Sequence, residues 1–347
     1  MSNFDPNAAA SQNSGIFGFI SSIEESALVI ISAPWEATCS YGKGTSDAPE
    51  CIFEASKFVE LFDNELGDFF SKGIAYLDLG ADIKNKGKKA QKLAAPIIQN
   101  GGIIHGKKLS TNKLQVDLMC EEMNSKTEQS VSNQLKNGKI VGLIGGEHSI
   151  SLGAIRAFIK KFHEMGVIQI DAHADLRDSF ESLKYSHASV MNNVLNMTKL
   201  KKLVQVGVRG YCQEEAEKIA FLKGRVVTYF ESDISAQVCS SVTWDAICID
   251  IVRQLPEYVY ISLDVDGLEP SNCPNAGTPV PGGLTYREAT HLMKKIAKSG
   301  KKIVGFDLVE VSCGKLGANS WDAKLAAHLL YKLCGFCLTS NTQKHDS

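Results

Sequence analysis

Short apolar stretches rich in Val, Ile, Leu and Tyr recur along the whole chain. A continuous apolar run of four to eight residues, bounded by glycine or polar residues, is typical of a strand that is buried on both faces. The pattern therefore predicts about eight strands, at residues 27–33, 74–79, 140–144, 167–170, 203–208, 225–230, 258–263 and 303–308.

Between most of these strands, apolar residues recur with the spacing of an amphipathic helix. The helical stretches include residues 114–136, 151–162, 213–222 and 286–298, and Thr285 is placed to cap the last of them. Apolar strands that alternate with helices indicate a parallel sheet covered by helices on both faces. The predicted fold class is therefore α/β.

No linker, repeat or low-complexity segment divides the chain, so we expect one domain over residues 16–340. Residues 1–15 are small and polar and lack the basic and apolar regions of a secretory signal, which predicts a disordered tail. Residues 100–107 and 268–283 are expected to form long loops at the rim of the sheet. No segment reaches the roughly 20 apolar residues that span a bilayer, so we expect no membrane partner.

Composition excludes some partners. The chain has 37 Lys and Arg against 39 Asp and Glu, with a formal net charge of -2. It therefore has no basic field to attract nucleic acid.

The 10 cysteines are scattered, and only Cys334 and Cys337 are closely spaced. A single C-x-x-C is weak evidence for zinc or redox chemistry, so we interpret the cysteines as free thiols in a reducing, cytoplasmic compartment.

The first candidate cluster is residues 145–149, Gly-Gly-Glu-His-Ser, which lies between a predicted strand and a predicted helix. His148 therefore lies at the carboxyl end of a strand, where parallel α/β sheets bind their ligands. By itself the short motif is more typical of a tight turn at Gly145 and Gly146 that carries a surface histidine.

The second cluster is residues 171–175, Asp-Ala-His-Ala-Asp, directly after the strand at 167–170. In extended backbone, alternate residues point to one face, so Asp171, His173 and Asp175 can converge on one point. Three charged groups with this spacing need a neutralising partner. The alternative is an aspartate-rich turn with an incidental histidine.

The third cluster is Asp264 and Asp266, at the end of the strand 258–263. Two carboxylates on one face raise each other's pKa unless a cation lies between them. An ordinary acidic turn leading into Gly267 is the alternative.

Together the clusters offer two histidines and four aspartates. This oxygen-rich set suits Mn²⁺, with Zn²⁺, Ni²⁺ or Co²⁺ as alternatives, and the number of ligands indicates two metal ions.

The motifs G-G-E-H-S, D-A-H-A-D and S-L-D-V-D-G-L-E-P, in this order and spacing, resemble the ureohydrolase family of arginases and agmatinases, over residues 42–336. The resemblance implies a three-layer α/β/α domain with an eight-stranded parallel sheet. It further implies two Mn²⁺ ions per subunit, which Asp171 and Asp264 would bridge. One ion would also bind His148 and Asp175, and the other His173 and Asp266. Homotrimers or homohexamers are usual in the family.

The resemblance also implies which residues act on the substrate. Glu310 matches the glutamate that grips the guanidinium, for which a carboxylate is suited because it can accept two N–H groups in a fork. His187 matches the histidine that carries a proton to the leaving amine, and Asp175 is counted among the catalytic residues as well as the ligands. A strand-end surface glutamate and an ordinary loop histidine are the alternatives. His105, His163, His291, His328 and His345 have no cluster around them and are expected to be ordinary.

The expected reaction is hydrolysis of a guanidino compound to urea and an amine, most simply agmatine to urea and putrescine, a step of polyamine metabolism. Arginine, guanidinobutyrate, guanidine and formimidoylglutamate remain as alternative substrates, and a catalytically silent binding protein is a further alternative. Residues 175–177, Asp-Leu-Arg, lack the asparagine that holds the α-carboxylate in arginases, which favours agmatine. Asp178 or Glu181 is then available for the distal ammonium. Arg177 either binds a substrate carboxylate or pairs with one of these acids. Cys313 and Trp321 lie where the sequence departs from the commoner family pattern.

Overall fold

The computed structural model describes residues 5–342, which contain one sheet of eight parallel strands. The strands match the eight predicted apolar stretches to within two residues at each end. Their bounds are β1 (Leu28–Ala33), β2 (Ile74–Asp78), β3 (Ile140–Gly145), β4 (Gly166–Ile170), β5 (Lys202–Val208), β6 (Val226–Phe230), β7 (Tyr258–Asp264) and β8 (Lys302–Val309).

The strand order in the sheet is β2-β1-β3-β8-β7-β4-β5-β6. The three predicted ligand clusters follow β3, β4 and β7, and Glu310 follows β8. These four strands are neighbours at the centre of the sheet. Because they are parallel, their carboxyl ends meet at one edge, and the polar residues that follow them meet there too.

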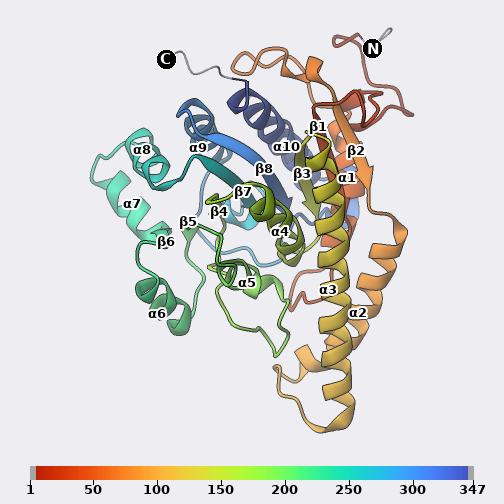
Figure 1. The fold of residues 1–347 in the computed structure, drawn as a ribbon, viewed down its shortest axis with the longest axis vertical. Helices are drawn as coiled ribbons and strands as arrows, with labels where there is room; N and C mark the ends of the chain where they lie inside the picture. The colour runs from red at the N-terminus through yellow and green to blue at the C-terminus, as the bar shows by residue number, and fades with distance from the viewer. Residues whose placement is uncertain (1–4, 343–347) are drawn as a thin grey trace.

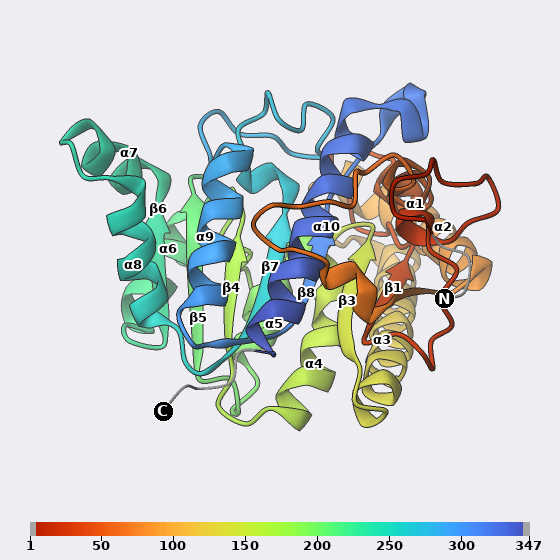
Figure 2. The same cartoon turned by 90° about the horizontal axis from the view of Figure 1, so that it is seen from above.

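Helices cover both faces of the sheet, which confirms the predicted three-layer α/β/α architecture (Figure 1). The helices are α1 (Ala48–Ser56), α2 (Ala81–Gln99), α3 (Gly106–Lys136), α4 (Ser151–Lys161), α5 (Val190–Leu195), α6 (Gln213–Phe221), α7 (Glu231–Cys239), α8 (Trp244–Gln254), α9 (Tyr286–Lys298) and α10 (Trp321–Ser340). Figure 2 shows α8, α9 and α10 side by side on one face of the sheet.

Two apolar cores follow from the alternation of side chains along the strands. Leu28 and Ile30 of β1 face the core under α1, α8, α9 and α10. Val29 and Ile31 face the core under α2, α3, α4 and α5. Because successive side chains of a strand point to opposite faces, an apolar strand supplies both cores at once. No described helix is both long enough and apolar enough to cross a membrane.

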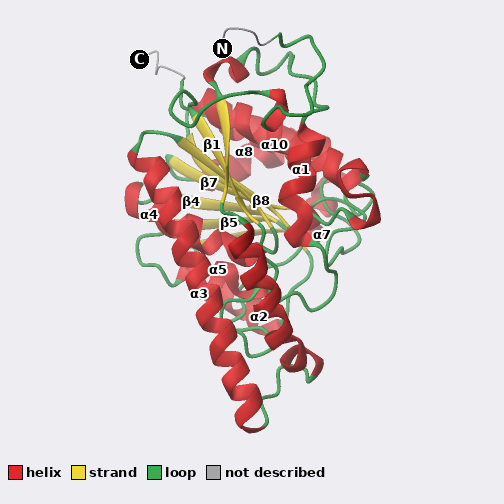
Figure 3. Ribbon diagram, turned by 90° about the vertical axis from the view of Figure 1, so that its right-hand side faces the viewer, coloured by secondary structure: helices red, strands yellow, loops and turns green. Residues whose placement is uncertain are grey.

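The helix predicted at residues 114–136 begins eight residues earlier, at Gly106, so the loop predicted at 100–107 is shorter than expected. The first turns of α3 are polar because α2 and α3 form a hairpin that extends beyond the sheet, where no core requires apolar residues (Figure 3). Thr285 caps α9 as predicted, since its side chain accepts a hydrogen bond from the amide of Glu288.

Part of the predicted N-terminal tail is described. Residues 5–15 form turns, and Ser14 is buried and donates a hydrogen bond to the carbonyl of Ser11. Residues 1–4 and His345 lie outside the described part of the chain. The disorder predicted for residues 1–15 stays a prediction, as does the domain boundary at residue 16.

Candidate metal centre

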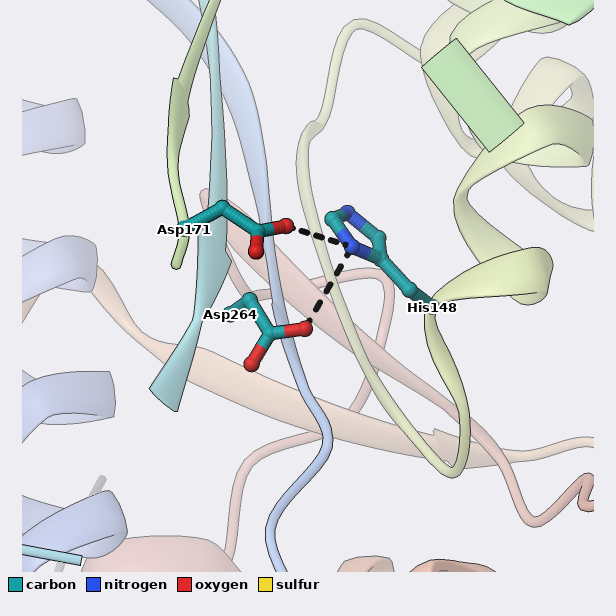
Figure 4. Close-up of side chains that lie close together, drawn as sticks. All are labelled: His148, Asp171 and Asp264. Carbon is teal, nitrogen blue, oxygen red and sulfur yellow. Dashed lines mark ion pairs between the residues drawn. The ribbon is translucent and has the colours of Figure 1, made fainter. Parts of the chain in front are cut away.

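His148 lies at the centre of a group of three aspartates at the carboxyl edge of the sheet. Its Nδ1 lies 3.1 Å from Oδ2 of Asp171, 3.0 Å from Oδ2 of Asp175 and 3.4 Å from Oδ2 of Asp264. Figure 4 shows the carboxylates of Asp171 and Asp264 turned toward this nitrogen. Donor atoms of His148, Asp171 and Asp264 lie close enough together to hold one metal ion.

A second group shares Asp171 with the first. Nδ1 of His173 lies 3.0 Å from Oδ2 of Asp266 and 3.6 Å from Oδ1 of Asp171. Asp171 therefore offers one carboxylate oxygen to each group, as a ligand that bridges two ions would. Among the described residues, Asp264 is grouped only with His148 and Asp171. Its Oδ1 accepts a hydrogen bond of 2.8 Å from the amide of Asp266.

The turn after β7 packs tightly against the end of β4 and so brings the two groups together. A Cβ atom on Gly267 would lie 2.6 Å from the backbone nitrogen of Asp171, so only glycine fits there. The amide of Ala172 donates a hydrogen bond of 3.0 Å to Oδ1 of Asp266. Gln169 donates to Oδ2 of Asp171 at 2.8 Å. These contacts fix the aspartates before any ligand binds.

Two further residues orient the ring of His148. The hydroxyl of Ser262 donates a hydrogen bond of 2.8 Å to Oδ1 of Asp307. Ser262 Oγ also lies 2.8 Å from Nε2 of His148 and, with its proton committed to Asp307, can only accept from Nε2–H. In the neutral ring, Nδ1 is then the nitrogen that carries the lone pair. A hydrogen-bonded partner on the far nitrogen is the usual arrangement of a metal-binding histidine.

Nδ1 of His148 is buried and has no hydrogen-bond partner, although three carboxylate oxygens lie within 3.4 Å of it. A buried polar atom without such a partner is costly in a folded protein. A cation shared by the imidazole lone pair and the carboxylates would satisfy it. The residues present therefore fit a metal ion.

The charges of the cluster lead to the same conclusion. Burial, with the charge of Asp171, raises the pKa of Asp175 to about 7. Burial and the charges of Asp266 and Asp171 raise the pKa of Asp264 well above its usual range. Burial alone would lower the pKa of His173, but its contacts with Asp171 and Asp266 raise it to about 12. Without metal the cluster must hold extra protons, whereas divalent cations would neutralise it directly.

Asp175 and Glu310 both adopt left-handed backbone conformations, with φ of 55° and 61°. Such values are uncommon for residues other than glycine, and they concentrate at functional sites. The amide of Glu310 donates to the carbonyl of Gly146 at 3.0 Å, while its Oε1 accepts from the amide of His148 at 2.7 Å. Both bonds tie Glu310 to the turn that carries the first histidine ligand. Burial and the charge of Glu147 raise the pKa of Glu310 well above its usual range.

Two loops meet beside Glu310. The amide of Gly42 donates to the carbonyl of Gly277 at 3.2 Å, and a Cβ atom on Gly42 would lie 2.6 Å from that same carbonyl oxygen. A Cβ atom on Gly277 would in turn lie 3.5 Å from Oε2 of Glu310. The buried carboxylate of Asp322 holds the same loop through the amide and side chain of Asn275, each at 2.8 Å. The start of α10, which Trp321 opens, thus fixes a wall of the site.

His187 begins a short 3-10 helix, His187–Ser189, which contacts the short helix His148–Ile150. Its Nδ1 lies 3.3 Å from the hydroxyls of Thr38 and Ser186, and its ring meets that of Phe180 edge to face at 5.8 Å. His187 is partly buried, and this desolvation, with positive charge on His173 and His148, lowers its pKa to about 4. His187 is therefore a neutral imidazole at neutral pH.

Asp178 and Glu181, the two acids considered for the distal ammonium, lie in the loop between the second cluster and His187 and have different partners. Asp178 pairs with Lys218 at 2.6 Å. Glu181 accepts a hydrogen bond of 2.9 Å from Ser40 and has no cationic partner among residues 5–342. The alternative in which Arg177 pairs with one of these acids is wrong. Its guanidinium instead lies 3.7 Å from Glu215 and over the ring of Phe180.

The remaining residues singled out from the sequence lie away from the centre. Cys334 and Cys337 are buried free thiols, as predicted, and Cys313 is also buried and free. His291 pairs with Asp245, and His328 contacts the carbonyl of Lys324. Neither belongs to a ligand group, and the same holds for His105 and His163 among the described residues.

The roles of Ser262, Asp307 and Gln169 were not identified from the sequence. Ser262 could have been found, because it lies two residues before Asp264 and hence on the same face of β7.

Comparisons with known proteins agree with this geometry. Residues 26–335 match the model of the arginase family. The chain is 30% identical to the N(1)-aminopropylagmatine ureohydrolase of Synechocystis, over 94% of each chain. It is 28% identical to the agmatinase of Bacillus anthracis, over 84% of this chain and 85% of that protein.

Solved structures share the fold. The agmatine ureohydrolase of Thermoplasma volcanium superposes with a TM-score of 0.70 and 28% identity, covering 92% of each chain. The resemblance seen in the three motifs is thereby confirmed over nearly the whole sequence, and the relatives are hydrolases. The chain belongs to the arginase family.

Proposed function

We propose that the protein hydrolyses agmatine, or a guanidino compound with a similar cationic tail, to urea and the corresponding amine. Agmatine would give putrescine, the step of polyamine metabolism expected from the sequence. We choose a substrate with a cationic tail because of one observation. The carboxylate of Glu181 has no cationic partner in the described chain. The relatives named N(1)-aminopropylagmatine ureohydrolase and agmatinase support this class of substrate.

The metal ligands would be His148, Asp171, Asp175 and Asp264 for one ion and His173, Asp171 and Asp266 for the other. The oxygen-rich set favours Mn²⁺ over metals that prefer thiolates, with Ni²⁺ as the main alternative. When bound, such a pair of ions supplies a nucleophilic water at neutral pH and positions it for attack. The family resemblance also assigns Asp264 to the second ion, as a bridge beside Asp171, and its Oδ1 accepts the Asp266 amide.

Glu310 is proposed to hold the guanidinium. It is 6% exposed, and its Oε1 is fixed by the amide of His148. Its other oxygen, Oε2, faces the glycine at 277, where the absence of a side chain leaves space. A buried carboxylate whose pKa is raised gains most from a cation that brings its own N–H donors. Substrate binding would keep Glu310 ionised and would place the guanidinium carbon beside the metal centre.

His187 is proposed to carry a proton to the leaving amine. Because burial and nearby positive charge lower its pKa to about 4, it starts neutral. It must therefore first take up a proton released at the reacting water, and its low affinity for that proton favours prompt transfer to the amine nitrogen. Amine departure needs this proton, since an unprotonated amine leaves poorly.

The tail of the substrate is proposed to meet Glu181. Ser40, which donates to Glu181, lies two residues from Thr38, which contacts His187, and Phe180 packs on the same imidazole. Glu181 is thus at the rim of the site on the His187 side. Asp178 is already neutralised by Lys218 and is not available for this task. Arg177 is held by Glu215 and Phe180, which argues against its binding a substrate carboxylate.

The experiment is a comparison of kcat/KM for agmatine, N(1)-aminopropylagmatine, arginine and guanidinobutyrate in the wild type, Glu181→Gln and the control Asp178→Asn. We expect the two carboxylate-free substrates to be preferred at least about tenfold, equivalent to about 1.4 kcal/mol of transition-state discrimination. Glu181→Gln should reduce that preference, whereas Asp178→Asn should keep it. A tenfold preference for arginine would contradict the proposal.

We also propose a location, a class of partner and an oligomeric state. Free cysteines throughout support a reducing compartment such as the cytoplasm. The formal net charge of -2 gives no reason to expect a nucleic-acid partner. A homotrimer or homohexamer is expected from the family.

A further inference from the structure

Glu147, in the first motif, is a fully buried acid that takes no part in the proposed ligand sets. It is 0% exposed, and four donors surround its carboxylate. Oε2 accepts from the amide of Thr38 at 2.8 Å and from the thiol of Cys39 at 3.5 Å. Oε1 accepts from the hydroxyls of Thr38 at 3.0 Å and Ser149 at 2.7 Å. The carboxylate thus grips both the backbone and the side chain of Thr38.

Thr38 in turn contacts His187 twice. Its Oγ1 accepts a hydrogen bond of 3.2 Å from the backbone amide of His187 and lies 3.3 Å from Nδ1 of the ring. A threonine hydroxyl has a single proton. Since that proton is donated to Glu147, Oγ1 can offer only lone pairs to the imidazole. The contact is therefore favourable only when Nδ1 carries hydrogen.

The second neighbour of Nδ1 does not impose a tautomer. Ser186 Oγ also lies 3.3 Å from Nδ1 and accepts from the amide of Ala188 at 3.4 Å. Its own proton has no fixed acceptor, so it can donate to Nδ1 or turn away. Only the link from Glu147 through Thr38 distinguishes the two neutral forms of the ring.

We propose that Thr38, locked by Glu147, is a positioning residue that holds His187 in the Nδ1–H tautomer and reserves Nε2 for the transferred proton. A third group that fixes the tautomer of a catalytic imidazole is an established way to raise its efficiency, and the wrong tautomer is strongly impaired. Here a hydroxyl stands between the carboxylate and the ring. The inference rests on the proposed role of His187.

The test uses Thr38→Val, which removes the hydroxyl but keeps the size of the side chain and the amide that Glu147 grips. Ser186 can then donate to Nδ1 and stabilise the opposite tautomer. We expect kcat for agmatine to fall by about 10- to 100-fold, part of what positioned proton transfer contributes, with KM and bound metal nearly unchanged. Thr38→Ser should recover most of the loss. Thr127→Val is the matched control, because the hydroxyl of this buried threonine on α3 donates to the sulfur of Met123, away from His187.

A double-variant cycle separates this inference from the proposed function. If Thr38 acts through His187, Thr38→Val should have little further effect in a His187→Asn background. The positioning role of Thr38 would be overturned if Thr38→Val lowered kcat equally in both backgrounds, or if its lower kcat followed from lower metal content. Either result would leave the proposed role of His187 standing. Full activity of His187→Asn alone would instead overturn the proposed role of His187, and the inference with it.

Discussion

The backbone amide of His148 donates a 2.7 Å hydrogen bond to Oε1 of Glu310. His148 follows β3 and Glu310 follows β8, and these strands are neighbours in the sheet. One peptide group therefore links a proposed metal ligand to the carboxylate that is proposed to bind the guanidinium of the substrate. This rigid link would keep the guanidinium carbon at a fixed distance and orientation from the attacking water, as efficient attack requires.

Replacing Glu310 with Gln should separate substrate binding from metal binding. Glutamine can still accept the amide of His148, but it loses the charge that binds a guanidinium. A charge-assisted pair of hydrogen bonds contributes about 1.5–3 kcal/mol, so kcat/KM for agmatine should fall by at least about tenfold. Bound manganese, measured by elemental analysis, should stay at the wild-type level. Unchanged kcat/KM would show that another group holds the guanidinium.

Ser262→Ala should weaken metal binding although Ser262 is not a ligand. The change removes the acceptor that holds Nε2–H of His148, so Nδ1 is no longer fixed as the free lone pair. Loss of such a partner typically lowers metal affinity by about 10- to 100-fold. The affinity can be followed by titrating metal-free protein with Mn²⁺. Ser56→Ala, which removes a buried hydroxyl near Phe17 far along the chain, is the control. Equal affinities in the two variants would contradict the orienting role.

The lowered pKa of the partly buried His187 predicts a difference in acid stability. Its pKa is about 4 in the folded protein and about 6.5 in the unfolded chain. A lowered pKa means that the unfolded state binds more protons, so stability is present above pH 6.5 and is lost as pH falls from about 6.5 to about 4. The melting temperature of the wild type should therefore fall faster over this range than that of His187→Asn. Parallel curves for the two proteins would mean that His187 is solvated.

The strands and ligand clusters could be predicted because both depend on local order along the chain. Apolar runs mark the buried strands, and the residues that follow them must lie at one edge of a parallel sheet. His148, Asp171, His173 and Asp264 could thus be brought together without knowledge of the strand order.

Other features could not be predicted because they depend on contacts between distant strands and loops. The orientation of His148 by Ser262 and Asp307 requires β7 and β8 to be neighbours, which local patterns do not encode. The partner of Arg177 lies on α6, far along the chain from the acids beside it. The polar start of α3 has no apolar period, since it extends beyond the core.

The central claim is that Asp171 joins two metal ions in a site that releases urea. The most direct measurement is bound manganese per chain, together with urea release from agmatine, in the wild type and in Asp171→Asn, with Asp178→Asn as control. We expect about two ions per chain in the wild type and the control. Asp171→Asn should lose at least one ion and nearly all activity, because each group takes a different oxygen of this carboxylate. Two ions retained with full urea release in Asp171→Asn would contradict the account.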